Sequence, residues 1–95
     1  MSDTKKIIRR EYKFTGYVQG VGFRYRARHF ADGLGITGWV MNEWDGSVLM
    51  QAQGTEAQLN ELLTQINRGS YISIDRIEYK ELPTEDTERS FHVRY

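Results

Sequence analysis

The fold is indicated first by residues 38–52, which read GWVMNEWDGSVLMQA. Runs typical of strands flank Asp45-Gly46, a dipeptide that tolerates the positive φ angles of a tight primed turn. Such a pattern is the strongest short-range signal of a β-hairpin. We therefore predict two antiparallel strands, over about residues 38–44 and 47–52, joined at Asp45-Gly46.

Upstream of the hairpin, the sequence predicts a strand and then a helix. Apolar and charged residues alternate from Ile8 to Phe14, with Arg10 as the exception on the buried face. Apolar residues then recur at helical spacing, and a glycine follows them as a stop signal: Phe23, Ala27, Phe30, Ala31, Leu34 and Gly35. We expect this helix over about residues 24–34.

Downstream, Thr55 and Gln58 have the spacing of a capping box. The helix that follows carries an apolar stripe and is expected to end at a glycine: Leu59, Leu62, Leu63, Ile66 and Gly69. A strand begins at Ile72 and Ile74, and a shift in apolar parity at Ile77 and Tyr79 indicates a bulge or a bend. Phe91, Val93 and Tyr95 mark a short closing strand.

This order of elements predicts an α+β fold, a ferredoxin-like α/β sandwich of βαββαβ order with a short additional C-terminal strand. Two helices would pack on one face of an antiparallel sheet. Large aromatic side chains are expected in its core and rim, namely Phe14, Phe23, Phe30, Trp39, Trp44 and Phe91.

Length and composition restrict the possible functions. At 95 residues we expect one domain over residues 7–95 and a disordered tail over residues 1–6. The 13 basic and 13 acidic side chains cancel, so a negatively charged ligand must be held locally. There is no cysteine, and no stretch is apolar enough for a signal peptide or a membrane span. We expect a cytoplasmic monomer.

The connection between the first strand and the first helix reads Gly16-Tyr17-Val18-Gln19-Gly20-Val21-Gly22-Phe23-Arg24. Two glycines in a short turn remove Cβ atoms that would keep an anion from backbone N–H groups. The turn leads into a helix N-terminus, which attracts negative charge. Arg24 adds a guanidinium that can bind phosphate through two parallel hydrogen bonds. We predict an anion site over Gln19 to Arg24.

A plainer interpretation is that the glycines only form a tight turn and that Arg24 is solvated. A nucleotide-binding P-loop is excluded, because no Gly-Lys-Ser/Thr sequence follows the glycines. A dinucleotide fingerprint fits poorly, because Tyr25 stands where a third glycine is needed.

Simple geometry brings Asn42 toward Arg24. The helix rises roughly 15 Å from the loop, and a strand that runs back beside it to Asn42 returns roughly 16 Å. A carboxamide near Arg24 can orient a water molecule but cannot take a proton from it. Local backbone bonds in the hairpin explain this asparagine equally well.

Both stretches resemble signatures of the acylphosphatase family. Residues 18–24 are similar to the first signature, and residues 34–42, LGITGWVMN, followed by Asp45-Gly46-Ser47-Val48, are similar to the second. Gln53-Gly54 is also typical, and the resemblance covers nearly all of residues 8–95. It implies that residues 7–95 form an acylphosphatase-like domain. The chain departs from the pattern at Met41, Leu49 and Ser70, and Met41 replaces a common basic residue.

By this resemblance the chain is an enzyme that hydrolyses the carboxyl-phosphate bond of a small-molecule acyl phosphate, which gives a carboxylate and inorganic phosphate. The family's catalytic arginine and asparagine fall on Arg24 and Asn42. Arg24 and the loop amides would hold phosphate, Asn42 would orient water, and no metal ion or other cofactor is implied. His29 and His92 are expected to be structural, because their predicted elements place them far from the loop.

Two other classes of function fit parts of the sequence. A binding module with the same sandwich would recognise phosphate or an acyl phosphate without turnover. An RNA-recognition domain shares the architecture, but Gly22-Phe23-Arg24-Tyr25 lies at a helix start instead of a central strand, and the net charge is zero. We therefore expect no nucleic-acid partner and no membrane partner.

Overall fold

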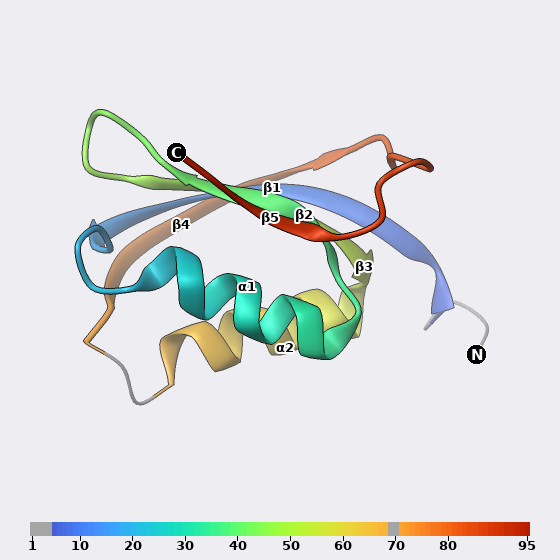
Figure 1. The fold of residues 1–95 in the computed structure, drawn as a ribbon, viewed down its shortest axis with the longest axis horizontal. Helices are drawn as coiled ribbons and strands as arrows, with labels where there is room; N and C mark the ends of the chain where they lie inside the picture. Colours follow the sequence, from blue (N-terminus) through green and yellow to red (C-terminus); the bar gives the residue numbers. More distant parts are fainter. Residues whose placement is uncertain (1–4, 69–70) are drawn as a thin grey trace.

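A computed structural model of the chain describes residues 5–68 and 71–95. Within them, the elements in chain order are β1 (Ile7–Tyr17), α1 (Phe23–Leu34), β2 (Thr37–Asn42), β3 (Val48–Thr55), α2 (Glu56–Asn67), β4 (Ser73–Leu82) and β5 (Phe91–Arg94). Both helices lie on the same face of the sheet (Figure 1). The predicted order and layering are confirmed. Residues 1–4 of the expected tail lie outside the described residues.

The described strands form one sheet in the order β4-β1-β3-β2-β5. Three of its four pairings are antiparallel, but β5 runs parallel to β2, so the sheet is mixed and the expectation of a fully antiparallel sheet is wrong at this edge. The reason is topological. β4 and β2 run in opposite directions, so a chain that leaves β4 and turns back along the other edge must run parallel to β2.

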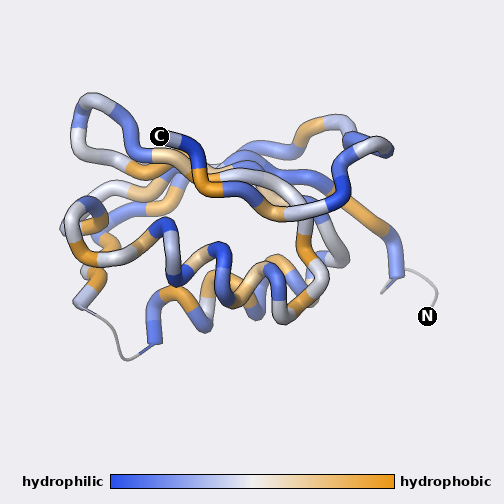
Figure 2. The backbone as a smooth tube through the Cα atoms, viewed as in Figure 1, coloured by the Kyte–Doolittle hydropathy of each residue, from blue (hydrophilic) through white to orange (hydrophobic). Residues whose placement is uncertain are grey.

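The core lies between the helices and the sheet. Hydrophobic residues recur along every helix and strand in alternation with hydrophilic ones (Figure 2). Each helix contributes a buried stripe, and the three central strands contribute alternate residues: Phe23, Ala27, Ala31, Leu59, Leu62, Ile66, Tyr12, Phe14, Val40, Val48, Met50 and Ala52. Trp44 is an exception, because it is 97% exposed at the hairpin tip and does not pack as expected.

The hairpin between β2 and β3 exists, but its turn differs from the prediction. Gly46 has φ 92°, and no described residue other than glycine has a positive φ, so Asp45 cannot belong to a primed turn. The loop is longer than two residues. It is closed by hydrogen bonds from the Glu43 N–H to the Ser47 carbonyl (2.9 Å) and from the Gly46 N–H to the Glu43 carbonyl (3.2 Å). As a result β2 ends at Asn42, directly before the loop.

The predicted bulge is found in β4. The register between β1 and β4 shifts between Thr15 and Gly16, which pair with Arg76 and Ile74 and leave Asp75 as the extra residue. Gly16 has φ 129°, and a Cβ at this position would lie 2.4 Å from the carbonyl oxygen of Ser73. Glycine is therefore required where β1 bends into the loop that leads to α1.

The two helix ends that matter most follow the sequence signals. Thr55 and Gln58 form the complete capping box of α2, and Gly35 ends α1 with φ 74°. The predicted stop of α2 at Gly69, and Ser70 after it, lie outside the described residues.

Arg9 is buried on the sheet face opposite the helices. Its side chain is 3% exposed, and its guanidinium donates to both carboxylate oxygens of Glu88, at 2.6 and 3.2 Å. It also donates to the side-chain oxygens of Gln51 and Gln53. Glu88 belongs to the connection between β4 and β5, so this ion pair fastens that connection to the sheet.

Replacement of Glu88 by Gln is expected to lower the free energy of unfolding at pH 7 by roughly 2 kcal/mol, because Arg9 stays buried without a charged partner. Burial alone would raise the pKa of Glu88, but its hydrogen bonds and the charge of Arg9 hold the pKa below the ordinary value of 4.5. The pair therefore stabilises the fold above pH 4.5 and stops doing so as the carboxylate is protonated in acid. Urea denaturation at pH 7 and at lower pH measures both effects.

Glu78→Gln is the matched control, because the ion pair of Glu78 with Arg76 is exposed. It should change the free energy of unfolding by no more than about 0.5 kcal/mol. A Glu88→Gln effect of that small size, or one that persists unchanged in acid, would contradict the assigned role of the Arg9–Glu88 pair.

Candidate functional site

The loop between β1 and α1 has a backbone that only glycine adopts readily. Gly20 and Gly22 have φ 74° and 81°. A Cβ at either glycine would meet no protein atom within 4 Å. The glycines are therefore required by conformation, and the expectation that they also leave room for an anion to reach the backbone N–H groups stays a prediction.

Helix α1 begins without a side-chain cap. Its N-cap is Gly22, no side chain accepts a hydrogen bond from the first turn, and no acidic residue lies in that turn. The Arg26 N–H donates to the Gly22 carbonyl at 3.0 Å as the helix begins. The N–H groups of residues 23–25 precede this bond and lack intrahelical acceptors. Together with the helix dipole they can bind an anion.

Helix α2 shows the opposite arrangement. The Thr55 hydroxyl accepts from the Gln58 N–H at 3.1 Å, and the Gln58 side chain accepts from the Thr55 N–H at 2.8 Å. Glu56 adds an acidic side chain to the first turn. The two helix starts therefore differ in their ability to bind an anion. The sequences of residues 20–24 and 55–58 determine this difference.

A cavity of about 190 Å³ lies at the open start of α1. It is lined by Val18, Gly20, Gly22, Phe23, Arg24, Tyr25 and Asn42. The β1–α1 loop and the β2–β3 loop lie at the same end of the molecule (Figure 1). Arg24 and Asn42 thus share one cavity, as the lengths of α1 and β2 predict.

The guanidinium of Arg24 is held from the side of β5. It lies 4.9 Å from the ring centroid of Tyr95, and it donates to the carbonyl oxygen of Arg94 at 3.4 Å. The Tyr95 hydroxyl is 2.6 Å from that of Tyr25, which also lines the cavity. This hydrogen bond raises the pKa of the Tyr95 phenol above its ordinary value. The phenol is therefore uncharged at neutral pH.

The other predicted loop residues have different places. Gln19 does not line the cavity, because its side-chain N–H₂ group donates to the carbonyl oxygens of Glu43 (2.7 Å) and Ser47 (2.8 Å). Val21 is partly buried against the core. Phe23 is buried, and its ring lies 4.8 Å from that of Phe14. Gln19 therefore ties the loop to the hairpin that carries Asn42.

The hairpin tip is stiffened by Asp45. Its carboxylate accepts from the Ser47 hydroxyl at 2.6 Å and from the Ser47 N–H at 3.0 Å, and Lys13 lies 3.3 Å away. The hydrogen bonds from Ser47, with a smaller contribution from Lys13, lower the pKa of Asp45 to about 2. Asp45 thus remains ionised at neutral pH and fixes Ser47, whose carbonyl receives Gln19.

Three residues at the site do not follow from the sequence reasoning. Val18 and Tyr25 flank the predicted stretch and line the cavity. Sequence reasoning could have found both, because extending the predicted stretch of residues 19–24 by one residue at each end includes them. Tyr95 reaches Arg24 from another strand, and nothing local in the sequence indicates that contact.

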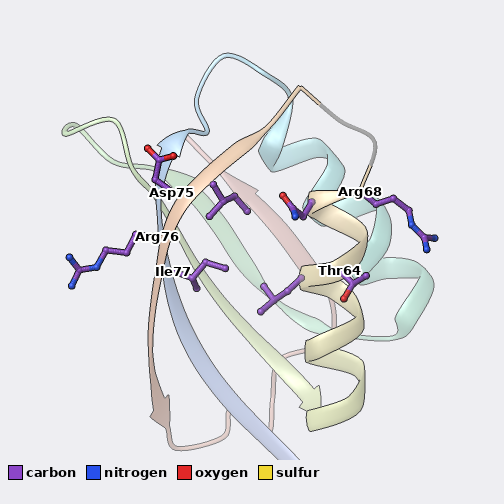
Figure 3. A pocket seen from close by; sticks show the side chains of 8 residues that line it. Thr64, Arg68, Asp75, Arg76 and Ile77 are labelled. Atoms are coloured by element: carbon purple, nitrogen blue, oxygen red, sulfur yellow. The ribbon is translucent and has the colours of Figure 1, made fainter.

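A larger hollow lies elsewhere, between α2 and β4, with a volume of about 690 Å³ (Figure 3). Arg68 and Arg76 project away from it to opposite sides, and Leu63, Ile74 and Ile77 supply apolar lining. Among the described residues that line it, no positively charged side chain points into it to hold a phosphate. It therefore does not compete with the cavity at α1.

His29 packs edge-on against Phe30, and His92 lies 3.0 Å from the Ser90 hydroxyl. Neither lines the cavity at α1.

In the described part of the chain, no group of three or more His, Asp or Glu side chains is arranged to hold a metal ion. None of the described helices is both long enough and apolar enough to cross a membrane.

Comparison with known proteins gives matches over most of the chain. The family model described as Acylphosphatase matches residues 10–93. An acylphosphatase of Clostridium acetobutylicum is 44% identical over 84 residues, which cover 87% of this chain and 92% of the relative. That of Oceanobacillus iheyensis is 45% identical over 83 residues, covering 84% and 90%. The crystal structure of acylphosphatase from Bacillus subtilis has a TM-score of 0.83 at 31% identity, covering 93% and 99%, which confirms the predicted fold class.

Replacement of Gln19 by Ala is expected to lower the free energy of unfolding by about 1–2 kcal/mol, because two carbonyl groups of the hairpin loop lose their donor. The Glu43 amide should also exchange hydrogen faster, since its acceptor, the Ser47 carbonyl, loses the hydrogen bond from Gln19 that holds it in place. Urea denaturation and amide hydrogen exchange measure these effects. Gln65→Ala is the control, because Gln65 bonds only to the exposed Glu61 side chain through its N–H₂ group. Equal effects of both substitutions would show that Gln19 does not link the loops.

Proposed function

The chain belongs to the acylphosphatase family, and on that premise we propose how its residues hydrolyse an acyl phosphate. The reaction class follows from the family. The assignment of roles to residues rests on one observation, namely that the uncapped start of α1, Arg24 and Asn42 line the same cavity.

In this proposal the phosphoryl group binds at the N-terminus of α1. Backbone N–H groups of the loop from Gln19 to Arg24 and the positive end of the helix dipole face its oxygens. Arg24 supplies a full positive charge and planar donors for two of these oxygens. Its place among the residues that line the cavity supports this role.

Asn42 orients the attacking water. The water oxygen forms a bond to phosphorus while the bond from phosphorus to the acyl oxygen breaks, and the electron pair of that bond leaves with the carboxylate. One water proton stays on the new hydroxyl, and the other passes to a phosphoryl oxygen, so the products are a carboxylate and inorganic phosphate. A carboxylate is a good leaving group, so positioning and charge neutralisation suffice and no general acid is needed.

The same proposal needs no divalent cation, because Arg24 and the loop amides already balance the phosphoryl charge. The roles proposed for Arg24, Asn42 and the loop amides are all filled from one chain, so the mechanism calls for no second copy. We therefore propose a metal-independent monomer that acts on small-molecule acyl phosphates. Its cytoplasmic location stays a prediction.

Replacement of Arg24 by Lys is expected to lower kcat at least about tenfold with folding intact. Lysine keeps the charge but cannot make the planar pair of hydrogen bonds, and loss of one transition-state donor commonly costs a few kcal/mol. The assay is steady-state hydrolysis of acetyl phosphate in the presence of EDTA. Unchanged turnover would reject Arg24 as the phosphate clamp, and loss of wild-type activity in EDTA would reject metal independence.

For Asn42→Ala we expect hydrolysis to fall at least about a hundredfold, a size typical of a lost positioning group. Inhibition of residual activity by inorganic phosphate, or its binding measured by calorimetry, should stay near the wild-type value. Asn60→Ala is the control, because Asn60 is exposed on α2, away from the cavity. If phosphate binding disappears together with activity, Asn42 holds the anion and does not merely orient water.

A further inference from the structure

The cavity at α1 is too small to enclose a large substrate. Its volume is about 190 Å³, whereas pockets that bury a whole drug-sized ligand have about 300–1,000 Å³. If the phosphoryl group occupies the floor, as the proposed function requires, a bulky acyl group must extend toward the opening. Its contacts then come from the residues at the rim.

The rim offers one side chain for such contacts. Among the lining residues, Val18 and Phe23 are buried, and two others are glycines. Arg24 and Asn42 face the phosphoryl group and water in the proposed mechanism. Tyr25 remains, and it is 52% exposed.

The Tyr25 ring is held in place from behind. Its hydroxyl is hydrogen-bonded to that of Tyr95 at 2.6 Å, and the Tyr95 ring in turn lies against the Arg24 guanidinium. Tyr95 is itself 88% exposed. Tyr25, which lines the cavity, and Tyr95, which is bonded to it, are an uncharged aromatic pair that we call the ledge. Because each tyrosine has few rotatable bonds, little conformational entropy is lost when a ligand contacts it.

We propose that this ledge, Tyr25 backed by Tyr95, is the subsite for the acyl group and selects acyl phosphates with an aromatic or extended apolar acyl group over acetyl phosphate. The inference rests on the proposed function, because it takes the phosphoryl group to sit at the start of α1. Aromatic contact supplies the selectivity, since a ring or apolar chain can lie against Tyr25 while the acetyl methyl group is too short to cover it.

The test compares benzoyl phosphate with acetyl phosphate. In the wild type, kcat/KM should be higher for benzoyl phosphate, and Tyr25→Ala should reduce the ratio of the two values about fivefold, mainly through KM for benzoyl phosphate. Tyr25→Phe keeps the ring and loses only the hydroxyl contact, so it should preserve the ratio within about twofold. Tyr71→Ala is the control, because Tyr71 is another exposed tyrosine, 88% exposed in the connection between α2 and β4.

Two results would overturn the subsite. An equal fall of kcat/KM for both substrates in Tyr25→Ala would mean that the tyrosine acts only through Arg24. A ratio that does not change would mean that the acyl group leaves the cavity along another path. Failure of the phosphate clamp is separable from both, because it appears as undiminished acetyl phosphate turnover in Arg24→Lys, which leaves the Tyr25 ring intact.

Discussion

The unsatisfied backbone N–H groups at the start of α1 are the constraint around which the rest of the site is arranged. The chain contains a full capping box at α2, built from Thr55 and Gln58, so an uncapped helix is not a general property of this sequence. At α1 a left-handed Gly22 takes the cap position and offers no side-chain acceptor. The free donors therefore need water or an anion as a partner. An anion bound there would complete the helix, so in the proposed mechanism recognition of phosphate and local stability are the same interaction.

Three separate segments turn this helix start into a site. Gly16 lets β1 bend at the bulge of β4. Gln19 then fixes the loop to the β2–β3 hairpin, so Asn42 and the amides keep one geometry. The parallel strand β5 brings Tyr95 to the other side and holds the Arg24 guanidinium. Each contact joins residues distant in sequence, so a change in one segment would shift the cavity as a whole.

The sequence predicts features that are encoded locally and misses those set by distant contacts. The order of elements, the capping box and the bulge each depend on patterns a few residues long, and they are confirmed. The meeting of Arg24 and Asn42 also follows, because it needs only element lengths. The primed turn at Asp45 is wrong because Ser47 and Gln19 favour a longer loop. The direction of β5 and the role of Tyr95 depend on the whole sheet topology, which no local pattern contains.

The buried Arg9–Glu88 pair connects the far side of the sheet to this site. A buried charge pair is a weak source of net stability, because the desolvation of both ions offsets their attraction. The pair contributes more to geometry than to net stability. Its bidentate hydrogen bonds, at 2.6 and 3.2 Å, fix the connection that leads into β5. β5 is short, spanning Phe91–Arg94, and it lies at the sheet edge. Without a fixed entry point, such a strand would hold Tyr95 against Arg24 poorly. The pair thus fixes the connection that leads into β5, and it does so from the face of the sheet that the helices leave open.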